Sequence, residues 1–217
     1  MDASPPPECA PRRAAGPPSV HSWPWPRRLG QLYGGLALYG ISMALLVRSE
    51  LGLIPWDVLH QGLARRLDVS MGTAVIGVSL LVLLTWVPLR ERPGIGTVSN
   101  ALLIGLVLDA ALLLLPPMGS LAARSALVVL GVLLNAVATA AYIGVHLGPG
   151  PRDGLMTGLV RRTGRSVRLV RTCIEGGVVL LGWLLGGTLG LATAVYAVAI
   201  GPLVQVFLPR LSMPPRR

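Results

Sequence analysis

The stretch LGLIPWDVLHQGLARR at residues 51–66 returns in altered form as LGPGPRDGLMTGLVRR at residues 147–162. The two copies lie 96 positions apart, align without a gap, and share a proline, an aspartate and a closing pair of arginines. An apolar composition pairs leucines and alanines by chance, but it does not bring proline, aspartate and a double arginine into one register. The repeat therefore predicts an internally duplicated chain.

Each copy predicts a break in the chain followed by a short helix, over 55–66 and 151–162. A glycine before the helix releases the preceding span from helical geometry, and a proline suits the first helical position. An aspartate two places later complements the positive end of the helix dipole. The residues concerned are Pro55, Trp56 and Asp57 in the first copy, Pro151, Arg152 and Asp153 in the second, and the break glycines Gly52, Gly148 and Gly150.

The composition predicts an all-α integral membrane protein in a lipid bilayer. The chain is 53% hydrophobic and 13% charged, with a mean hydropathy of +0.66, which is too apolar for a soluble domain of 217 residues. Apolar runs with few charged residues, long enough to cross a bilayer, predict about six transmembrane helices. Their approximate bounds are 29–48, 71–89, 95–116, 124–145, 169–186 and 190–208.

The duplication divides these spans into two repeats, over 29–116 and 124–209. The same offset of 96 also pairs Gly94 with Gly190 and Thr97 with Thr193. Because each repeat holds three spans, an odd number, the second copy enters the membrane from the opposite side. We therefore predict two inverted three-helix repeats, each with one short amphipathic or re-entrant helix.

Arginine positions predict the orientation. With the N-terminus inside, 15 of the 19 arginines fall in inner segments, which places both termini in the cytoplasm of a bacterial plasma (inner) membrane. The net charge of +10 is then a topology signal, and no nucleic-acid partner is expected. Residues 1–28 are predicted to be a disordered Pro/Ala/Arg-rich tail, and residues 210–217 a basic tail. Six short spans enclose little volume, which favours a homo-oligomer.

Two interpretations of the short helices remain open. In one, both lie in the membrane interface with their arginines at the headgroups. In the other, both are re-entrant and aim Pro55–Asp57 and Pro151–Asp153 at a shared cavity from opposite faces. A buried aspartate would need a partner there, which Arg152 or Arg48 would supply.

Two further carboxylates, Asp109 and Glu175, lie inside predicted spans, where an ionised carboxylate costs at least ~2.5 kcal/mol. Each is a candidate for a solute pathway. Each also has a plain explanation, because Asp109 lies near the outer headgroups and Glu175 lies one turn from Arg171. Neither has an acidic counterpart in the other repeat, where Gln205 and Ser79 stand.

Catalytic and cofactor motifs are missing from the sequence. The two cysteines, Cys9 and Cys173, predict neither a disulfide framework nor a metal site. The glycines of 148–154 lack the spacing of a phosphate loop and follow a membrane span. No nucleophile and base can be paired from their spacing. We expect no cofactor, no metal and no enzymatic activity.

The span region, roughly 30–209, resembles the YczE family of bacterial integral membrane proteins, which groups loosely with YitT-like proteins. The resemblance rests on GLIPWDVLHQGLA, RERPGIGTVSNALLIGLVLD, LGPGPRDGLMTGL and RTCIEGGVVLLGWLLGG. It implies a polytopic inner-membrane protein without an established activity. It carries over no catalytic residues.

The sequence leaves two functions open. The first is a small transporter or channel-like protein for an unknown small solute, with its site between the inverted repeats. The second is a membrane-embedded accessory or assembly protein that docks a cytoplasmic partner or anionic lipid. The candidate contacts for the second function are Arg161, Arg162, Arg165, Arg168 and Arg171.

Overall fold

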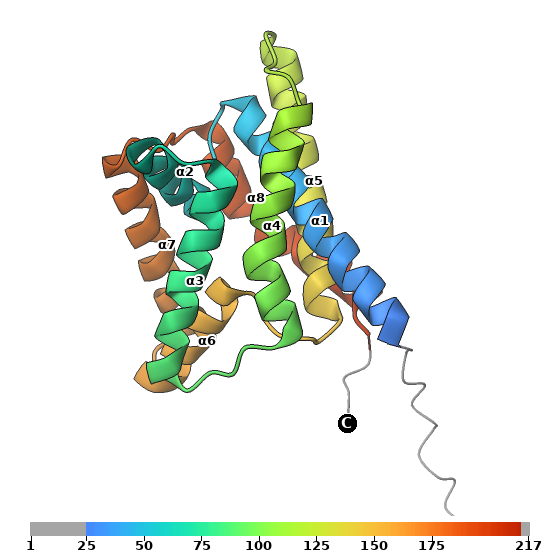
Figure 1. Cartoon of the computed structure of the whole chain (residues 1–217), viewed down its shortest axis with the longest axis vertical. Helices are drawn as coiled ribbons and strands as arrows, with labels where there is room; N and C mark the ends of the chain where they lie inside the picture. The colour runs from blue at the N-terminus through green and yellow to red at the C-terminus, as the bar shows by residue number, and fades with distance from the viewer. Residues whose placement is uncertain (1–24, 214–217) are drawn as a thin grey trace, which may run out of the picture.

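The computed structural model describes residues 25–213, which form helices and connecting segments without a strand (Figure 1). Residues 1–24 and 214–217, which make up most of the tails predicted over 1–28 and 210–217, lie outside the described residues. The eight helices are α1 (Trp25–Ser49), α2 (Pro55–Leu67), α3 (Met71–Leu89), α4 (Ile95–Leu114), α5 (Leu121–Gly144), α6 (Pro151–Thr163), α7 (Val167–Leu184) and α8 (Leu191–Leu211).

Local signals in the sequence explain where most helices begin. Ser70, Ser120 and Ser166 cap α3, α5 and α7, each accepting a hydrogen bond from a backbone N–H three residues later. Pro55 and Pro151 open α2 and α6, as their missing N–H allows. These starts explain why the short helices coincide with the repeated motif to within a residue.

Both ends of the helical region reach into the stretches predicted as tails. Helix α1 begins at Trp25, ahead of the predicted boundary after residue 28, and α8 continues to Leu211. Pro26 does not prevent the earlier start, because a proline in the first turn sacrifices no intrahelical hydrogen bond.

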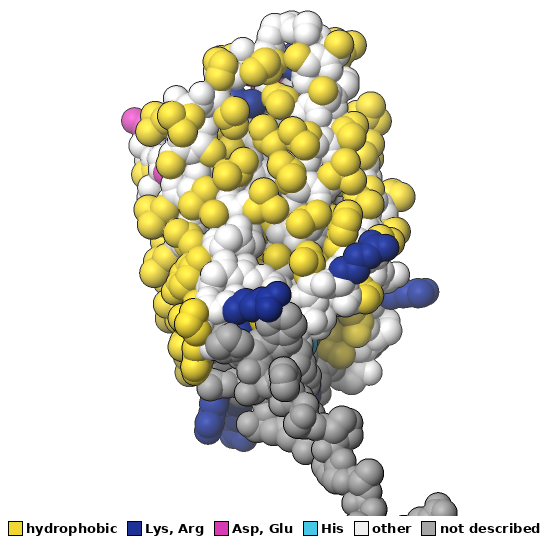
Figure 2. Space-filling model, turned by 90° about the vertical axis from the view of Figure 1, so that its right-hand side faces the viewer, with side chains coloured by type: hydrophobic (Ala, Val, Ile, Leu, Met, Phe, Trp, Pro, Cys, Tyr) yellow, Lys and Arg dark blue, Asp and Glu magenta, His cyan; other side chains and the backbone are white. Residues whose placement is uncertain are grey.

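Five of the helices, α1, α3, α4, α5 and α8, are long and apolar enough to cross a membrane. Helix α7 has only 18 residues and carries Arg168, Arg171 and Glu175. The outer surface is apolar: Leu113, Leu114 and Val198 are 88%, 83% and 78% exposed. Figure 2 shows apolar side chains over most of one face, with arginines mainly toward its lower end. A surface of this kind belongs in lipid, so the chain is a multi-pass helical membrane protein.

The helices form two groups that face each other. The first group contains α1, α4, α5 and α8, with α1 packed along α5 at its centre; the second contains α2, α3, α6 and α7. The main core lies mostly in the first group, where Leu32, Leu36 and Met43 are fully buried, and it extends to Val58 of α2 and Val75 of α3. In Figure 1 the two short helices of the second group lie at different heights, α2 above α6.

The packing follows the sequence repeat with one exception. Helix α4 packs on α1 as α8 packs on α5, and α2 packs on α7 as α6 packs on α3. The exception concerns the last two helices of each repeat. Helix α3 packs along α4, whereas α7 makes few direct contacts with α8.

Candidate functional site

The two chain breaks before the short helices are built alike and contact each other's repeat. The backbone N–H of Ala192 donates to the carbonyl of Leu51, and that of Gly96 donates to the carbonyl of Leu147, each at 3.0 Å. Both the donors and the acceptors are 96 positions apart. Each break is thereby fixed to the first turn of the last helix of the other repeat.

Glycine is required at two of the three predicted break positions. Gly52 and Gly148 have φ angles of +129° and +127°, which only glycine adopts readily. A Cβ at these positions would also lie 2.8 Å from the hydroxyl of Thr193 and 2.7 Å from that of Thr97, respectively. Gly150 differs, because its φ of −62° suits any residue. An added Cβ there would lie 3.1 Å from the Oδ2 atom of Asp153.

The breaks bring the first turns of α2 and α6 together inside the protein. The Asp57 side chain is fully buried, and a guanidinium nitrogen of Arg152 lies 3.9 Å from its Oδ1 atom. The Arg152 guanidinium also lies over the ring of Trp56, 5.1 Å from its centre. Three residues of the repeated motif, from both copies, therefore meet at one point. The alternative partner, Arg48, donates instead to the carbonyl of Leu112 in α4.

Asp57 is only partly satisfied in this position. Its Oδ1 atom lies 3.0 Å from the Nδ1 atom of His60, one turn along α2. Its Oδ2 atom and the Nε2 atom of His60 are buried without a hydrogen-bond partner. An unpaired oxygen on a buried carboxylate is costly, so this pair belongs among the candidate functional groups.

The second aspartate of the repeat is held differently. Asp153 accepts a hydrogen bond of 2.7 Å from the hydroxyl of Tyr142 in α5. The indole N–H of Trp86 donates to the carbonyl of Pro151 at 3.1 Å, which fixes the start of α6. The ring of Trp86 occupies the space that a side chain at Gly154 would need.

A cavity of 340 Å³ lies beside these residues. Five of the predicted pathway residues line it, namely Pro55, Trp56, Arg152, Asp153 and Glu175. Arg171, predicted as a lipid or partner contact, lines it as well, whereas Asp57 is not part of the lining and lies 3.9 Å from Arg152. Apolar side chains from α5, α7 and α8 form much of the remaining wall. The structure thus brings most of the predicted pathway residues to a single cavity.

The two carboxylates predicted inside spans have separate positions. Glu175 lines the cavity and pairs with Arg171 at 2.8 Å. Asp109 lies away from it and accepts hydrogen bonds from the backbone N–H of Gly72 at 2.7 Å and the hydroxyl of Ser70 at 2.5 Å. Asp109 therefore fastens the start of α3 to α4.

Three of the four arginines that end the two copies of the repeated motif bind carbonyls at the ends of neighbouring helices. Arg161 donates to the carbonyl of Leu89 at 2.9 Å and pairs with Glu91 at 2.9 Å, and Arg162 donates to the carbonyl of Pro88 at 2.8 Å. Arg65, the counterpart of Arg161, donates to the carbonyl of Gly186. Carbonyls at the end of a helix attract cations. Arg165 and Arg168 remain exposed at the surface.

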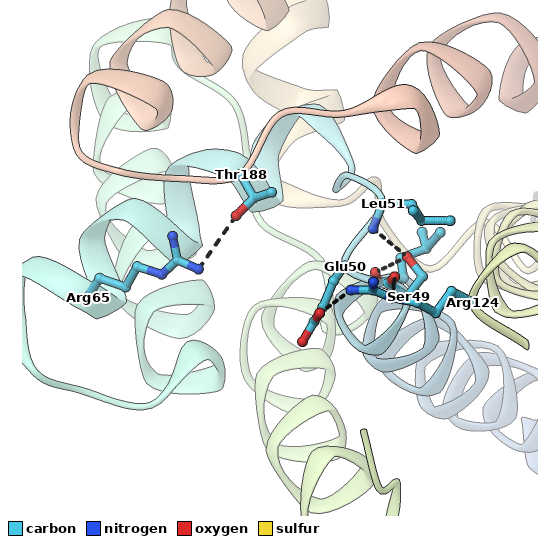
Figure 3. Close-up of polar contacts among 7 residues, drawn as sticks. Ser49, Glu50, Leu51, Arg65, Arg124 and Thr188 are labelled. Carbon is cyan, nitrogen blue, oxygen red and sulfur yellow. Dashed lines mark hydrogen bonds and ion pairs between the residues drawn. The ribbon is translucent and has the colours of Figure 1, made fainter. Parts of the chain in front are cut away.

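Arg124 and Arg65, both on the predicted outer side, make further contacts with the protein. Arg124 donates to the carbonyl of Ser49 at 2.8 Å and pairs with Glu50. Arg65 reaches the hydroxyl of Thr188 at 3.5 Å (Figure 3). These arginines close the ends of α1 and α7.

Several polar residues beside the cavity were not predicted. Tyr196 lines the cavity and donates to Asn135 at 2.8 Å, and Asn135 donates to Ser42 at 2.8 Å. A polar amide inside a membrane span is rare and is a functional signal in its own right. Asn135 was therefore visible in the sequence, whereas the tyrosines give no such signal. Within residues 25–213, no three metal-ligating side chains cluster.

The fold and this buried charged site define the chain as a helical multi-pass membrane protein with ionisable groups in its interior. The chain belongs to a family of unknown function, DUF6198, whose family description matches residues 26–209. It is 43% identical to an uncharacterized protein of Haemophilus influenzae, over 80% of this chain and 79% of that protein. It is 30% identical to the uncharacterized membrane protein YczE of Bacillus subtilis, over 82% and 84% of the two chains. The resemblance to the YczE family is thereby confirmed, and no solved structure matches the chain.

Proposed function

We propose that the chain is a small transporter of the bacterial inner membrane, with its solute site in the 340 Å³ cavity. The proposal includes six spans as two inverted repeats and both termini in the cytoplasm. The reciprocal hydrogen bonds of Leu51 with Ala192 and Leu147 with Gly96 support the repeat. The arginine distribution supports the orientation.

Helix α7 serves as the sixth span in this proposal. Its charged residues, Arg168, Arg171 and Glu175, lie in its first half, and Gly176–Leu184 is uncharged. Long side chains near a helix end reach the headgroup region, so these charges are tolerated at the cytoplasmic surface.

The two short helices are re-entrant in this proposal. The first turns of α2 are buried from Pro55 to His60, and Pro151 and Gly154 of α6 are also buried. A helix lying flat in the interface would expose one side along its whole length. Burial of the N-terminal ends favours short helices that dip into the protein.

The observation that carries the proposal is the meeting of Asp57 and Arg152, 3.9 Å apart at the cavity. Removing both charges from water is expensive, and their attraction recovers that cost only with good geometry. A charged pair drawn from the two repeats, with one carboxylate oxygen unpaired, is therefore better explained by solute binding than by stability. Movement of one repeat against the other would separate the pair and expose the site alternately to each side.

Access to the cavity is the first test. Single cysteines at Thr139, Ile174 and Gln205, in a background with Cys9 and Cys173 replaced by serine, are labelled with a membrane-impermeant maleimide from either side. We expect labelling of all three from the cytoplasmic side. A cysteine at lipid-facing Leu106 is the control and should not react. Cavity cysteines that resist the reagent from both sides would contradict the proposal.

Transport itself is tested with the purified protein in liposomes on a solid-supported membrane. Rapid addition of organic anions, cations or zwitterions should give a transient current with one class. Arg152→Gln should abolish that current because it removes the guanidinium charge from the meeting point of the two repeats. Arg92→Gln removes the same charge from an exposed position and should leave the current intact. Equal currents from both variants would refute a site at Arg152.

A second candidate function rests on Arg165 and Arg168, which are exposed beside the clamped Arg161 and Arg162. In the accessory function these two arginines would contact anionic lipid or a cytoplasmic partner. The double variant R165Q/R168Q should then fail to restore the phenotype of cells that lack the gene, while Asp57→Asn should restore it. The transporter proposal predicts the opposite pattern.

A further inference from the structure

The two repeats differ in how their last two helices pack. In the first repeat, Gly72 of α3 lies against Gly105 of α4, and its N–H donates to Asp109 at 2.7 Å. A side chain at Gly72 would collide with the carbonyl of Gly105. Gly72 lets α3 approach α4 closely, and its hydrogen bond to Asp109 fastens the two helices together.

The second repeat has lost both features. The positions 96 residues later hold Arg168 in place of Gly72 and Gln205 in place of Asp109. Gly201 corresponds to Gly105, yet a Cβ on Gly201 would meet nothing within 4 Å. Gly201 and Gln205 line the cavity together with Glu175 of α7. The cavity therefore reaches the gap between α7 and α8, on the side of the molecule that faces lipid.

At its deep end the cavity offers one cation with unfilled donors. A guanidinium has five N–H donors, but among residues 25–213 Arg152 makes no hydrogen bond and has only the 3.9 Å approach to Asp57 and the face of Trp56. Its side chain is 22% exposed. The carboxylates nearby are engaged, because Asp153 accepts from Tyr142 and Glu175 pairs with Arg171.

Between Arg152 and the gap, the wall combines apolar side chains with polar ones such as Tyr196 and Gln205. Ile143, Ile174, Ile200 and Val204 line this part of the cavity. A ligand that satisfies both ends needs an anionic group for the guanidinium fork and an apolar portion for the wall. A small hydrophilic ion would leave these apolar side chains uncovered, and a cation would be repelled by Arg152.

We propose that the cavity binds an amphipathic organic anion, whose carboxylate or phosphate contacts Arg152 and whose apolar part lies along the gap between α7 and α8. This inference rests on the proposed function, because it names the substrate class of the same cavity. Of the residues that line the cavity at this gap, Arg171, Ile174 and Glu175 come from the first half of α7, and Val204 and Gln205 come from the second half of α8. In the proposed orientation, the ligand therefore enters sideways from the cytoplasmic leaflet.

Binding of tritiated oleate to the purified protein in a neutral detergent tests the inference. We expect unlabelled oleate to displace the probe, and oleyl alcohol and oleylamine, which have the same tail without the anion, to displace it poorly. Arg152→Gln should weaken binding by about tenfold or more, as expected for loss of charge-assisted hydrogen bonds. Arg92→Gln should bind as the unmodified chain does.

A second pair of variants tests the apolar end without touching the charged site. Gly201→Phe should fill the gap and reduce oleate binding, whereas Gly34→Phe, at another helical glycine with open space around it, should not. This pair decides the matter if Arg152→Gln fails to fold. Displacement by phosphatidylglycerol would identify a membrane lipid as the source of the anion, and displacement by oleate alone would identify a free fatty acid.

The inference and the proposed function fail in different ways. The proposal that the cavity binds an amphipathic anion would be overturned by either of two results. One is equal displacement of the probe by oleyl alcohol, and the other is unchanged oleate binding in both Arg152→Gln and Gly201→Phe. If hydrophilic solutes then still give currents that depend on Arg152, the transporter proposal stands and only the substrate class is wrong. If the maleimide labels none of the cavity cysteines from either side, the proposed transport function itself is contradicted.

Discussion

Asp57 is the residue at which burial and charge conflict most sharply. Its side chain is fully buried, one carboxylate oxygen has no hydrogen-bond partner, and the other lies between His60 and Arg152. Removing one partner of a buried charged pair is generally destabilising, because the other partner stays in place without compensation.

Asp57→Asn should therefore lower the free energy of unfolding by about 1–3 kcal/mol, since the amide supports His60 and Arg152 less well than the carboxylate. Thermal unfolding of the purified protein in detergent measures the change. Asp68→Asn, at an exposed position after α2, is the control. The double variant with Arg152→Gln should cost less than the sum of the two single changes. Strict additivity would mean that the two residues do not interact.

The break glycines give a second prediction at this scale. Gly52→Ala and Gly148→Ala should each destabilise the protein by roughly 1–3 kcal/mol, because alanine is strained at a φ near +130°. Gly34→Ala, in the middle of α1 with open space around it, should instead stabilise by about 0.5–1 kcal/mol. Unfolding temperatures of the three variants check this. A neutral effect at both breaks would contradict the need for glycine.

At the scale of helices, Asp109 and Gln205 occupy equivalent positions with different consequences. Asp109→Ala removes two hydrogen bonds that fasten α3 to α4 and should cost about 1–3 kcal/mol. Gln205→Ala in α8 removes a side chain that lines the cavity and should leave stability nearly unchanged. Unfolding in detergent compares the two variants. A similar loss in both would show that α7 and α8 are held together after all.

The helices could be predicted where the responsible signals are local. Serine caps, prolines at the first helical position and uncharged runs fix the bounds of α2, α3 and α6 within one residue. The start of α1 could not be placed in this way, because Trp25 and Pro26 resemble the proline-rich segment before them.

Most of the predicted site residues come from the duplicated motif, and Glu175 was predicted from its charge inside a span. The re-entrant interpretation of the repeated motif named Arg152 or Arg48 as the partner of a buried aspartate, and Arg152 is the arginine that lies beside Asp57. Tyr142 and Trp86 were missed, because each comes from a long span whose rotation depends on packing against distant helices. Their repeat-equivalent positions hold Leu46 and Gly182, so the repeat marks neither of them.

At the scale of the whole molecule, the state of α7 decides the topology. Five helices qualify as spans by length and composition, and five crossings would leave the two termini on opposite sides of the membrane. The proposed sixth crossing, α7, returns the C-terminus to the cytoplasm. The segment between α7 and α8, which includes Thr188, then lies outside, where Arg65 reaches it.

Reporter fusions distinguish these two topologies. Green fluorescent protein fused after Arg217 should fluoresce, because it folds in the cytoplasm, and alkaline phosphatase at that position should be inactive. Fused after Thr188, alkaline phosphatase should be active, because six crossings put that segment outside. Fusions after Arg90, which both topologies place inside, provide the control. Because α7 lines the cavity with Arg171, Ile174 and Glu175, an inactive phosphatase at Thr188 would remove the sixth span and the inverted repeat together. The gap between α7 and α8 would then no longer face the cytoplasmic leaflet.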